Sequence, residues 1–281
     1  MEQQLRGSTR TAPAGTAEWR VELGFHSDRG RVRGNNEDNF LLFDLGRGAA
    51  LDHDGQGASL ALAPRGLVMA VADGMGGMNG GELASRICVE TLAATLHEHH
   101  AANSAPWRAV LRDAVQRANL EIFRQASQDS STQGMGTTLT AAIIEPGGVF
   151  IVQVGDSRCY LGRDRTLVQL TRDQTVWESM ISAGREQPDG LEHAPWTNML
   201  MQAVGSQPDL DEVTTEHDLQ AGDWMVLCTD GLYRVVAAGD IAGVLHEPSS
   251  APEKARALVA LANERGGPDN VTTIVCQVNA K

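Results

Sequence analysis

Acidic residues beside glycine or asparagine recur where apolar, strand-like stretches of the sequence begin or end. Four such clusters lie along the chain, at residues 35–38, 73–77, 230–231 and 267–270. Carboxylate oxygens are the ligands that Mg²⁺ and Mn²⁺ prefer, and a neighbouring glycine lets a backbone carbonyl approach the same ion. One Asp-Gly or Asp-Asn pair alone favours a simple turn. Four clusters brought together by strand ends would place like charges side by side and would require a cation.

Eight apolar or alternating stretches predict the strands that would position these clusters. They are residues 20–26, 39–43, 67–72, 138–144, 149–154, 158–162, 224–228 and 271–278. Apolar residues at helical spacing predict helices over 83–96, 107–122 and 255–262, and shorter helices are expected after Asp173 and Asp240. Because the strands cluster rather than alternate strictly with helices, their order predicts an α+β layered domain.

Polar and turn-rich segments separate these elements. Residues 45–65 and 184–197 predict surface loops or flaps. Residues 1–18 contain no apolar run, which predicts a flexible N-terminal tail without a signal peptide or membrane anchor. No stretch reaches membrane-spanning length, so we expect a cytoplasmic protein.

The overall composition excludes several classes of function. Hydrophobic residues make up 42% of the 281 residues and charged residues 21%, which is ordinary for a globular domain and excludes wholesale disorder. The net charge of −13 opposes contact with phosphate backbones and anionic lipids, so neither nucleic acid nor membrane is an expected partner. The four cysteines lie far apart in apolar stretches without a CxxC pair, which predicts reduced core residues.

Seven short motifs, taken in order, resemble those of the metal-dependent protein phosphatases of type 2C, the PPM family. They are SDRGRVRGNNED (27–38), ADGMGG (72–77), GTT (136–138), VGDSR (154–158), LTRD (170–173), CTDGL (228–232) and DNVT (269–272). Each motif alone is weak, but the ordered set is specific, and the resemblance runs from about Val21 to the C-terminus. It implies a central antiparallel β-sandwich flanked by helices, a four-layer αββα fold. The single phosphatase domain would span 19–281, with a flap around 174–205.

The same resemblance implies a centre of two Mn²⁺ or Mg²⁺ ions at one end of the sandwich. By motif, Asp73 would bridge both ions. Glu37 and the carbonyl of Gly74 would bind one ion, and Asp230 with Asp269 would bind the other. The resemblance also allows a third, weaker ion.

Three further residues take roles from the resemblance. Asp38 would orient the attacking water, and Asp156 together with Asp230 would form the weaker third metal site. Arg33 would grip the substrate phosphate, because a planar guanidinium suits two phosphate oxygens better than an ammonium does. Arg33, Asp38 and Asp73 are therefore the expected catalytic residues.

The implied reaction is hydrolysis of phosphoserine or phosphothreonine in proteins by a water that the two ions activate. The expected partners are phosphorylated proteins, the targets of a serine/threonine kinase in a signalling pathway. The alternative is a non-catalytic member of the same fold that binds phosphoproteins. One departure concerns the chemistry: some members have His directly after the Asp-Gly pair, whereas this chain has Met75.

Overall fold

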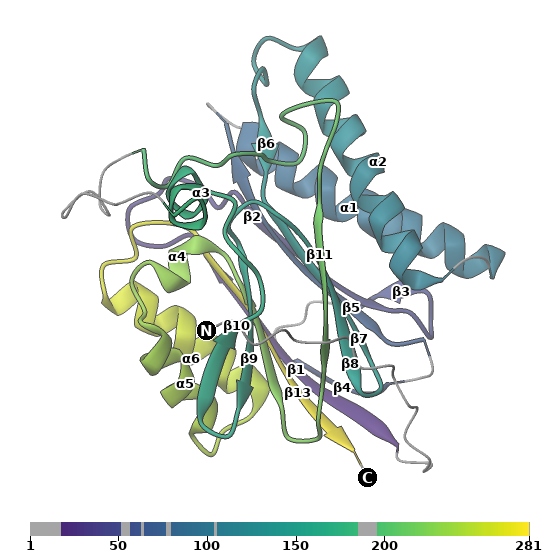
Figure 1. The fold of residues 1–281 in the computed structure, drawn as a ribbon, viewed down its shortest axis with the longest axis vertical. Coiled ribbons are helices and arrows are strands. Elements are labelled where there is room, and N and C mark those ends of the chain that lie inside the picture. Colours follow the sequence, from purple (N-terminus) through teal and green to yellow (C-terminus); the bar gives the residue numbers. More distant parts are fainter. Residues whose placement is uncertain are drawn as a thin grey trace.

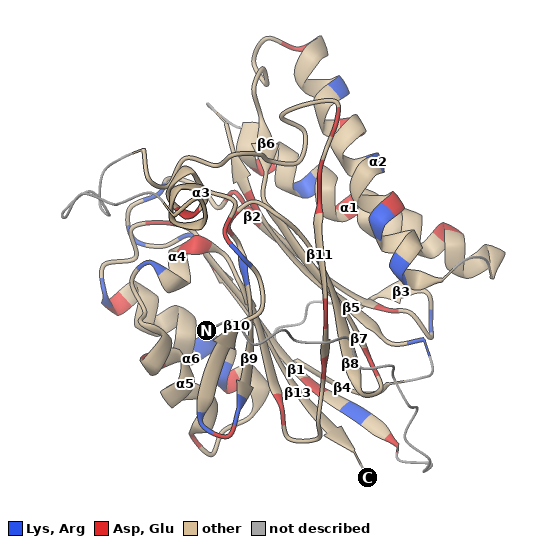
Figure 2. Cartoon of the chain, in the orientation of Figure 1, with Lys and Arg blue, Asp and Glu red and all other residues tan. Residues whose placement is uncertain are grey.

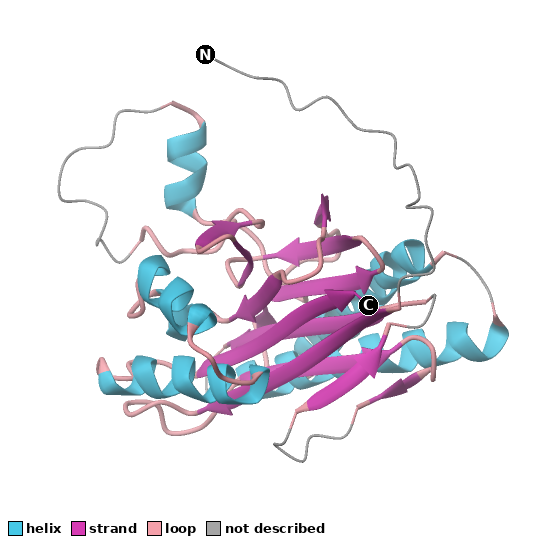
Figure 3. Cartoon of the chain, turned by 90° about the horizontal axis from the view of Figure 1, so that it is seen from below, coloured by secondary structure: helices cyan, strands magenta, loops and turns pink. Residues whose placement is uncertain are grey.

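Two antiparallel β-sheets pack face to face, and helices cover both outer faces (Figures 1 and 3). The computed structural model describes residues 18–51, 57–62, 65–76, 80–103, 106–184 and 196–280. Layers of helix, sheet, sheet and helix follow one another, as the family resemblance implied. The predicted α+β fold with a central β-sandwich is therefore confirmed.

The first sheet joins strands from both ends of the chain. Its order is β10 (Thr166–Gln169), β9 (Arg158–Arg163), β12 (Trp224–Cys228), β13 (Val271–Ala280), β1 (Trp19–Asp28) and β4 (Ala58–Ala61). The longest pairing is between β1 and β13, which run antiparallel from Trp19 opposite Ala280 to Asp28 opposite Val271. The N-terminal and C-terminal acidic clusters are brought close by this pairing.

The second sheet contains the central part of the chain. Its order is β11 (Val213–Asp218), β8 (Gly148–Val154), β7 (Leu139–Glu145), β5 (Leu67–Met75), β2 (Asp38–Asp44) and β3 (Ala49–Ala50), and β6 (Gly136–Thr137) pairs with the end of β5. Residues 67–72 of β5 are all apolar and all buried, as suits a strand that is covered on both faces. Met69 and Val71 pack between the sheets, while Val68 and Ala70 pack on the opposite face, beneath helices.

Helices α1 (Gly80–Ala102) and α2 (Trp107–Gln128) cover the second sheet, and α5 (Ala238–His246) and α6 (Ala251–Glu264) cover the first. Helix α6 begins with a reciprocal capping box between Ser250 and Glu253. Helix α3 (Val176–Ser182) has no buried residue and stands outside the layers (Figure 3). The predicted helices are confirmed, although α5 begins two residues before Asp240 rather than after it.

The prediction of one loop over 45–65 is wrong in part, because β3 and β4 lie within it. Both are short edge strands. The sequence of β4 is Ala-Ser-Leu-Ala, which lacks the β-branched residues that are typical of strands. Strands β6, β10 and β11 were also not expected, and they are short or lie at sheet edges. The predicted tail lies almost entirely outside the described residues, as do residues 185–195 of the predicted flap.

All four cysteines are buried and unpaired as thiols, which confirms the prediction of reduced core residues. In the part of the chain that the structure describes, no helix has both the length and the apolar character needed to cross a membrane.

Candidate metal centre

Strand ends from both sheets meet at one end of the sandwich, and each brings an acidic residue. Asp38 begins β2 and lies directly opposite Asp73, near the end of β5. From the first sheet, Asp230 follows β12 and begins the short helix α4 (Asp230–Tyr233), while Asp269 precedes β13. Asp156 comes just after β8. Figure 2 shows acidic segments gathered around the start of β2 and α4.

A cavity of about 500 Å³ opens among these strand ends. Its lining includes every predicted site residue except Asp38: Arg33, Glu37, Asp73, Gly74, Asp156, Asp230 and Asp269. Asp38 is only 6% exposed and does not reach the surface of the cavity. Thus seven of the eight predicted residues share one cavity, and the eighth pairs in register with one of them.

Two threonines hold Asp73 in place. The hydroxyl of Thr138 accepts a hydrogen bond from the Asp73 amide at 3.1 Å, and the hydroxyl of Thr137 donates to the Asp73 carbonyl at 2.9 Å. Gly74, the next residue, lies against the backbone of the first turn of α1. A Cβ atom at position 74 would lie 2.0 Å from the carbonyl oxygen of Gly81, so only glycine fits this approach.

Asn270 connects the loop that carries Glu37 to the start of β13. Its side-chain oxygen accepts a hydrogen bond from the Glu37 amide at 2.8 Å, and its side-chain nitrogen donates to the carbonyls of Arg29 and Asn35. Asn270 is itself buried. The sequence indicated Asn270 only as part of an acidic cluster, and this connecting role was missed.

Burial and mutual repulsion perturb the acidic groups strongly. Burial, followed by the charges of neighbouring aspartates, raises the pKa of Asp38 to about 7, against hydrogen bonds from Thr272 and Thr229 that lower it. Burial likewise raises the pKa of Asp230 to about 6, although Arg234 opposes the shift. The pKa of Asp73 is raised well above its ordinary value by burial and by Asp230 and Asp38. Cations are needed if all of these groups are to be ionised together.

Two carboxylate oxygens of the cluster lack a hydrogen-bond donor. With the carboxyls ionised, Asp38 Oδ1 and Asp230 Oδ1 are buried and receive no hydrogen bond from the described residues. The other oxygen of each group has a donor: Thr229 Oγ1 at 2.8 Å for Asp38, and Arg234 Nη2 at 2.7 Å for Asp230. Orphaned carboxylate oxygens suit a hard divalent cation. No three His, Cys, Asp or Glu side chains within the described ranges already converge closely enough to form a ligand set.

Comparison with known proteins identifies the family. Residues 56–273 match the family model described as protein phosphatase 2C. The chain belongs to the protein phosphatase 2C family. It is 34% identical over 259 residues to the serine/threonine phosphatase stp of Listeria welshimeri, covering 91% of this chain and 95% of that protein.

Solved structures of serine/threonine phosphatases share the fold. The crystal structure of the Mycobacterium tuberculosis serine/threonine phosphatase PstP/Ppp superposes with a TM-score of 0.76 at 33% identity, covering 92% of this chain and 99% of that one. A structure of the PstP catalytic domain in complex with two manganese ions has a TM-score of 0.74 at 32% identity, covering 93% and 99% of the respective chains.

Two arginines of this type 2C phosphatase chain bind the acidic groups. Arg33 Nη2 lies 2.7 Å from Asp269 Oδ2, and the Arg33 side chain is half exposed at the cavity. The predicted contact of Arg33 with substrate phosphate stays a prediction. Arg234, which the sequence reasoning missed, pairs with Asp230 and also lies near Asp156. The spacing of Asp230 and Arg234, four residues apart across a helical turn, was the available signal.

Proposed function

We propose that the protein is a serine/threonine protein phosphatase that hydrolyses phosphoserine and phosphothreonine with two bound Mn²⁺ or Mg²⁺ ions. The observation that carries the proposal is that acidic side chains from both sheets line one cavity beside Arg33, among them Asp230 with an orphaned, buried oxygen. The named relatives and the structure that holds two manganese ions support the same function.

The residues would divide between two metal ions. Asp73 would bind both, Glu37 and the Gly74 carbonyl would bind one, and Asp230 with Asp269 would bind the other. When bound, the ions would lower the pKa of a water molecule and neutralise charge on the phosphoryl group. Release of Asp269 from Arg33 would make both groups available, the carboxylate for an ion and the guanidinium for phosphate.

Asp38 and Arg33 would act on the water and the phosphate. Asp38 Oδ1 has no donor, so it can accept a hydrogen bond from the attacking water and orient it. Thr229 fixes the other Asp38 oxygen and thereby the direction of the carboxyl. Arg33 would bind two phosphate oxygens through its planar guanidinium.

No covalent enzyme intermediate is needed. Burial raises the pKa of the Cys88 and Cys228 thiols to about 12, so both stay protonated and unreactive near neutral pH. Neither residue lines the cavity. A water nucleophile is therefore the better match to this site.

The direct test is hydrolysis of a phosphothreonine peptide by the full chain with Mn²⁺, followed by removal of the metal with EDTA. We expect turnover that EDTA abolishes and that added Mn²⁺ restores. Peptide binding without turnover at saturating Mn²⁺ would favour the alternative, a non-catalytic phosphoprotein-binding member of the fold. All of the carboxylates predicted to bind metal line one cavity, which argues against that alternative.

We further propose that the phosphoprotein substrates are targets of a serine/threonine kinase and that the protein acts in the cytoplasm as part of a signalling pathway. The strongly acidic composition supports protein substrates over nucleic acid or anionic membranes as partners.

A further inference from the structure

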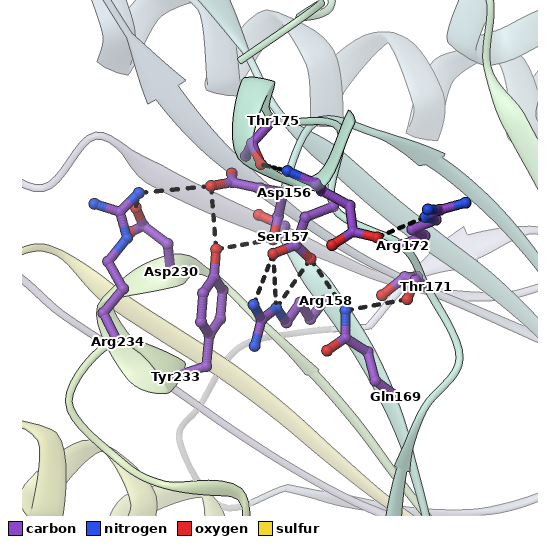
Figure 4. A network of polar contacts seen from close by, with 12 residues as sticks. Asp156, Ser157, Arg158, Gln169, Thr171, Arg172, Thr175, Asp230, Tyr233 and Arg234 are labelled. Atoms are coloured by element: carbon purple, nitrogen blue, oxygen red, sulfur yellow. Dashed lines mark hydrogen bonds and ion pairs between the residues drawn. The ribbon is translucent and has the colours of Figure 1, made fainter. Parts of the chain in front are cut away.

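One guanidinium nitrogen lies between two of the buried carboxylates. Arg234 Nη2 is 2.7 Å from Asp230 Oδ2 and 3.5 Å from Asp156 Oδ2, and Figure 4 shows these three side chains together. The Arg234 side chain is 35% exposed, whereas those of Asp156 and Asp230 are only 6% and 10% exposed. The positive charge thus lies between two groups that could otherwise share a divalent cation.

Asp156 is further held by a tyrosine that is itself fixed in place. The Tyr233 hydroxyl donates to Asp156 Oδ2 at 3.1 Å. The guanidinium of Arg158 lies 3.5 Å from the centre of the Tyr233 ring (Figure 4). The same guanidinium is paired with Asp173 at 2.6 Å. The same oxygen of Asp156 therefore faces two protein donors, and a metal ion there would have to displace Arg234.

Asp230 divides its two oxygens between different partners. Oδ2 binds Arg234, whereas Oδ1 is buried and receives no hydrogen bond within the described chain when the carboxyls are ionised. The orphaned Oδ1 remains for the ion that Asp230 and Asp269 are proposed to bind. Arg234 therefore occupies one side of Asp230 without using the oxygen needed for the proposed two-metal centre.

We propose that Arg234 is a built-in counterion that takes the place of a third divalent cation between Asp156 and Asp230. A guanidinium stays charged at every pH that the protein would meet, so it compensates these two carboxylates permanently. The chain then binds two divalent ions rather than three. This inference rests on the proposed two-metal phosphatase function.

The test counts bound ions on the full chain. Metal-free protein is titrated with Mn²⁺, and free Mn²⁺ is followed by electron paramagnetic resonance. We expect two sites in the wild type and a third site in Arg234→Ala, weaker by about tenfold or more because only two carboxylates supply it. Adding Asp156→Asn to Arg234→Ala should remove this third site. Arg234→Lys keeps the positive charge and should bind two Mn²⁺ ions, like the wild type.

Three controls separate the possible failures. Arg265→Ala breaks an ion pair with Asp240 at an arginine of matching exposure, 36%, that does not line the cavity, and it should leave the count at two. Asp156→Asn alone should leave the wild-type count unchanged, whereas a fall by one site would show that Asp156 already holds an ion beside Arg234. This comparison does not require Arg234→Ala to fold. Three sites in the wild type, or two in folded Arg234→Ala, would overturn the counterion role. Peptide turnover measured in parallel tests the phosphatase proposal separately.

Discussion

Asp38, Asp230 and Asp269 each have a protein donor on one carboxylate oxygen, and Arg234 is the donor to Asp230. Thr229 serves Asp38, and Arg33 serves Asp269. These donors hold the carboxyl groups in fixed directions, and the orphaned Oδ1 of Asp38 marks where water or a cation can bind. The donors thus determine which oxygens remain available for chemistry.

Replacing Arg33 should impair substrate binding more than metal binding. Arg33→Ala is expected to raise KM for a phosphothreonine peptide about tenfold or more, because a charge-assisted contact to phosphate is lost. Arg33→Lys should recover only part of the effect, since an ammonium cannot form the bidentate contact. Steady-state kinetics at saturating Mn²⁺ provide the measurement. Wild-type KM in Arg33→Lys would show that bidentate geometry does not matter here.

Met75 lies at the cavity, in a position where its side chain cannot serve as a general acid. Its side chain is 39% exposed and lines the cavity, but a thioether cannot protonate a serine or threonine alkoxide as it leaves. Met75→His is expected to increase hydrolysis of a phosphothreonine peptide more than that of p-nitrophenyl phosphate, whose leaving group needs no proton. The peptide's pH–rate profile should then gain a descending limb near pH 6.5, the ordinary pKa of His. Equal effects on both substrates at matched metal occupancy would argue against a missing acid.

At the scale of secondary structure, the site depends on close approach between strand ends and helix starts. Strand β5 ends at Met75, and the chain at Gly74 passes the first turn of α1 so closely that no side chain fits. This contact fixes the Gly74 carbonyl, one of the proposed metal ligands.

Gly74→Ala should therefore destabilise the protein by about 1–3 kcal/mol, since the added methyl group would meet backbone atoms. It should also weaken Mn²⁺ binding. The matched control is Gly239→Ala in α5, where an added Cβ would meet nothing within 4 Å. That variant should be neutral or stabilised by about 0.5–1 kcal/mol, because alanine favours a helix. Urea unfolding in EDTA measures the free energy of unfolding of both variants. Equal stability of the two variants would contradict the role of Gly74.

Elements with long apolar patterns were predictable from the sequence, whereas short edge strands were not. Strand β5 contains an unbroken apolar run and helix α1 has apolar residues at helical spacing, whereas β3 and β4 are too short to show either pattern. The four acidic clusters were predictable because they lie at strand ends, whereas Asp156 and the role of each side chain came from the family resemblance. The roles of Asn270 and Arg234 were not, because each depends on which distant segments meet in three dimensions.

At the scale of the whole molecule, folding itself creates the charge problem that metal binding would solve. Asp38 and Asp73 come from the second sheet, and Asp230 and Asp269 from the first, so the sandwich brings the two pairs together. In the unfolded chain these groups would titrate near their ordinary pKa of 3.8.

This difference predicts an unusual pH dependence of stability without metal. The pKa values of Asp38 and Asp230 are raised to about 7 and about 6 on folding, so the folded state holds more protons between pH 4 and these values. Their contribution to stability is full below about pH 3.8 and is lost as pH rises through 6 to 7. In EDTA, the Tm of the wild type should therefore fall more steeply from pH 5 to pH 8 than that of Asp38→Asn, whose amide cannot ionise.

Thermal unfolding of both proteins across this range provides the check. Saturating Mn²⁺ should stabilise the wild type more at pH 8 than at pH 5, because ions bind the deprotonated carboxylates. Parallel Tm profiles for the wild type and Asp38→Asn in EDTA would show that Asp38 does not carry a raised pKa.

The most direct test of the central claim follows turnover and bound metal in one titration. Mn²⁺ is added stepwise to metal-free protein, and the hydrolysis of a phosphothreonine peptide is measured at each occupancy. We predict no turnover without metal, a rate that rises with occupancy of the second ion, and loss of both tight sites and of activity in Asp73→Asn. Turnover by metal-free protein, or two unchanged tight sites in Asp73→Asn, would contradict a centre bridged by Asp73.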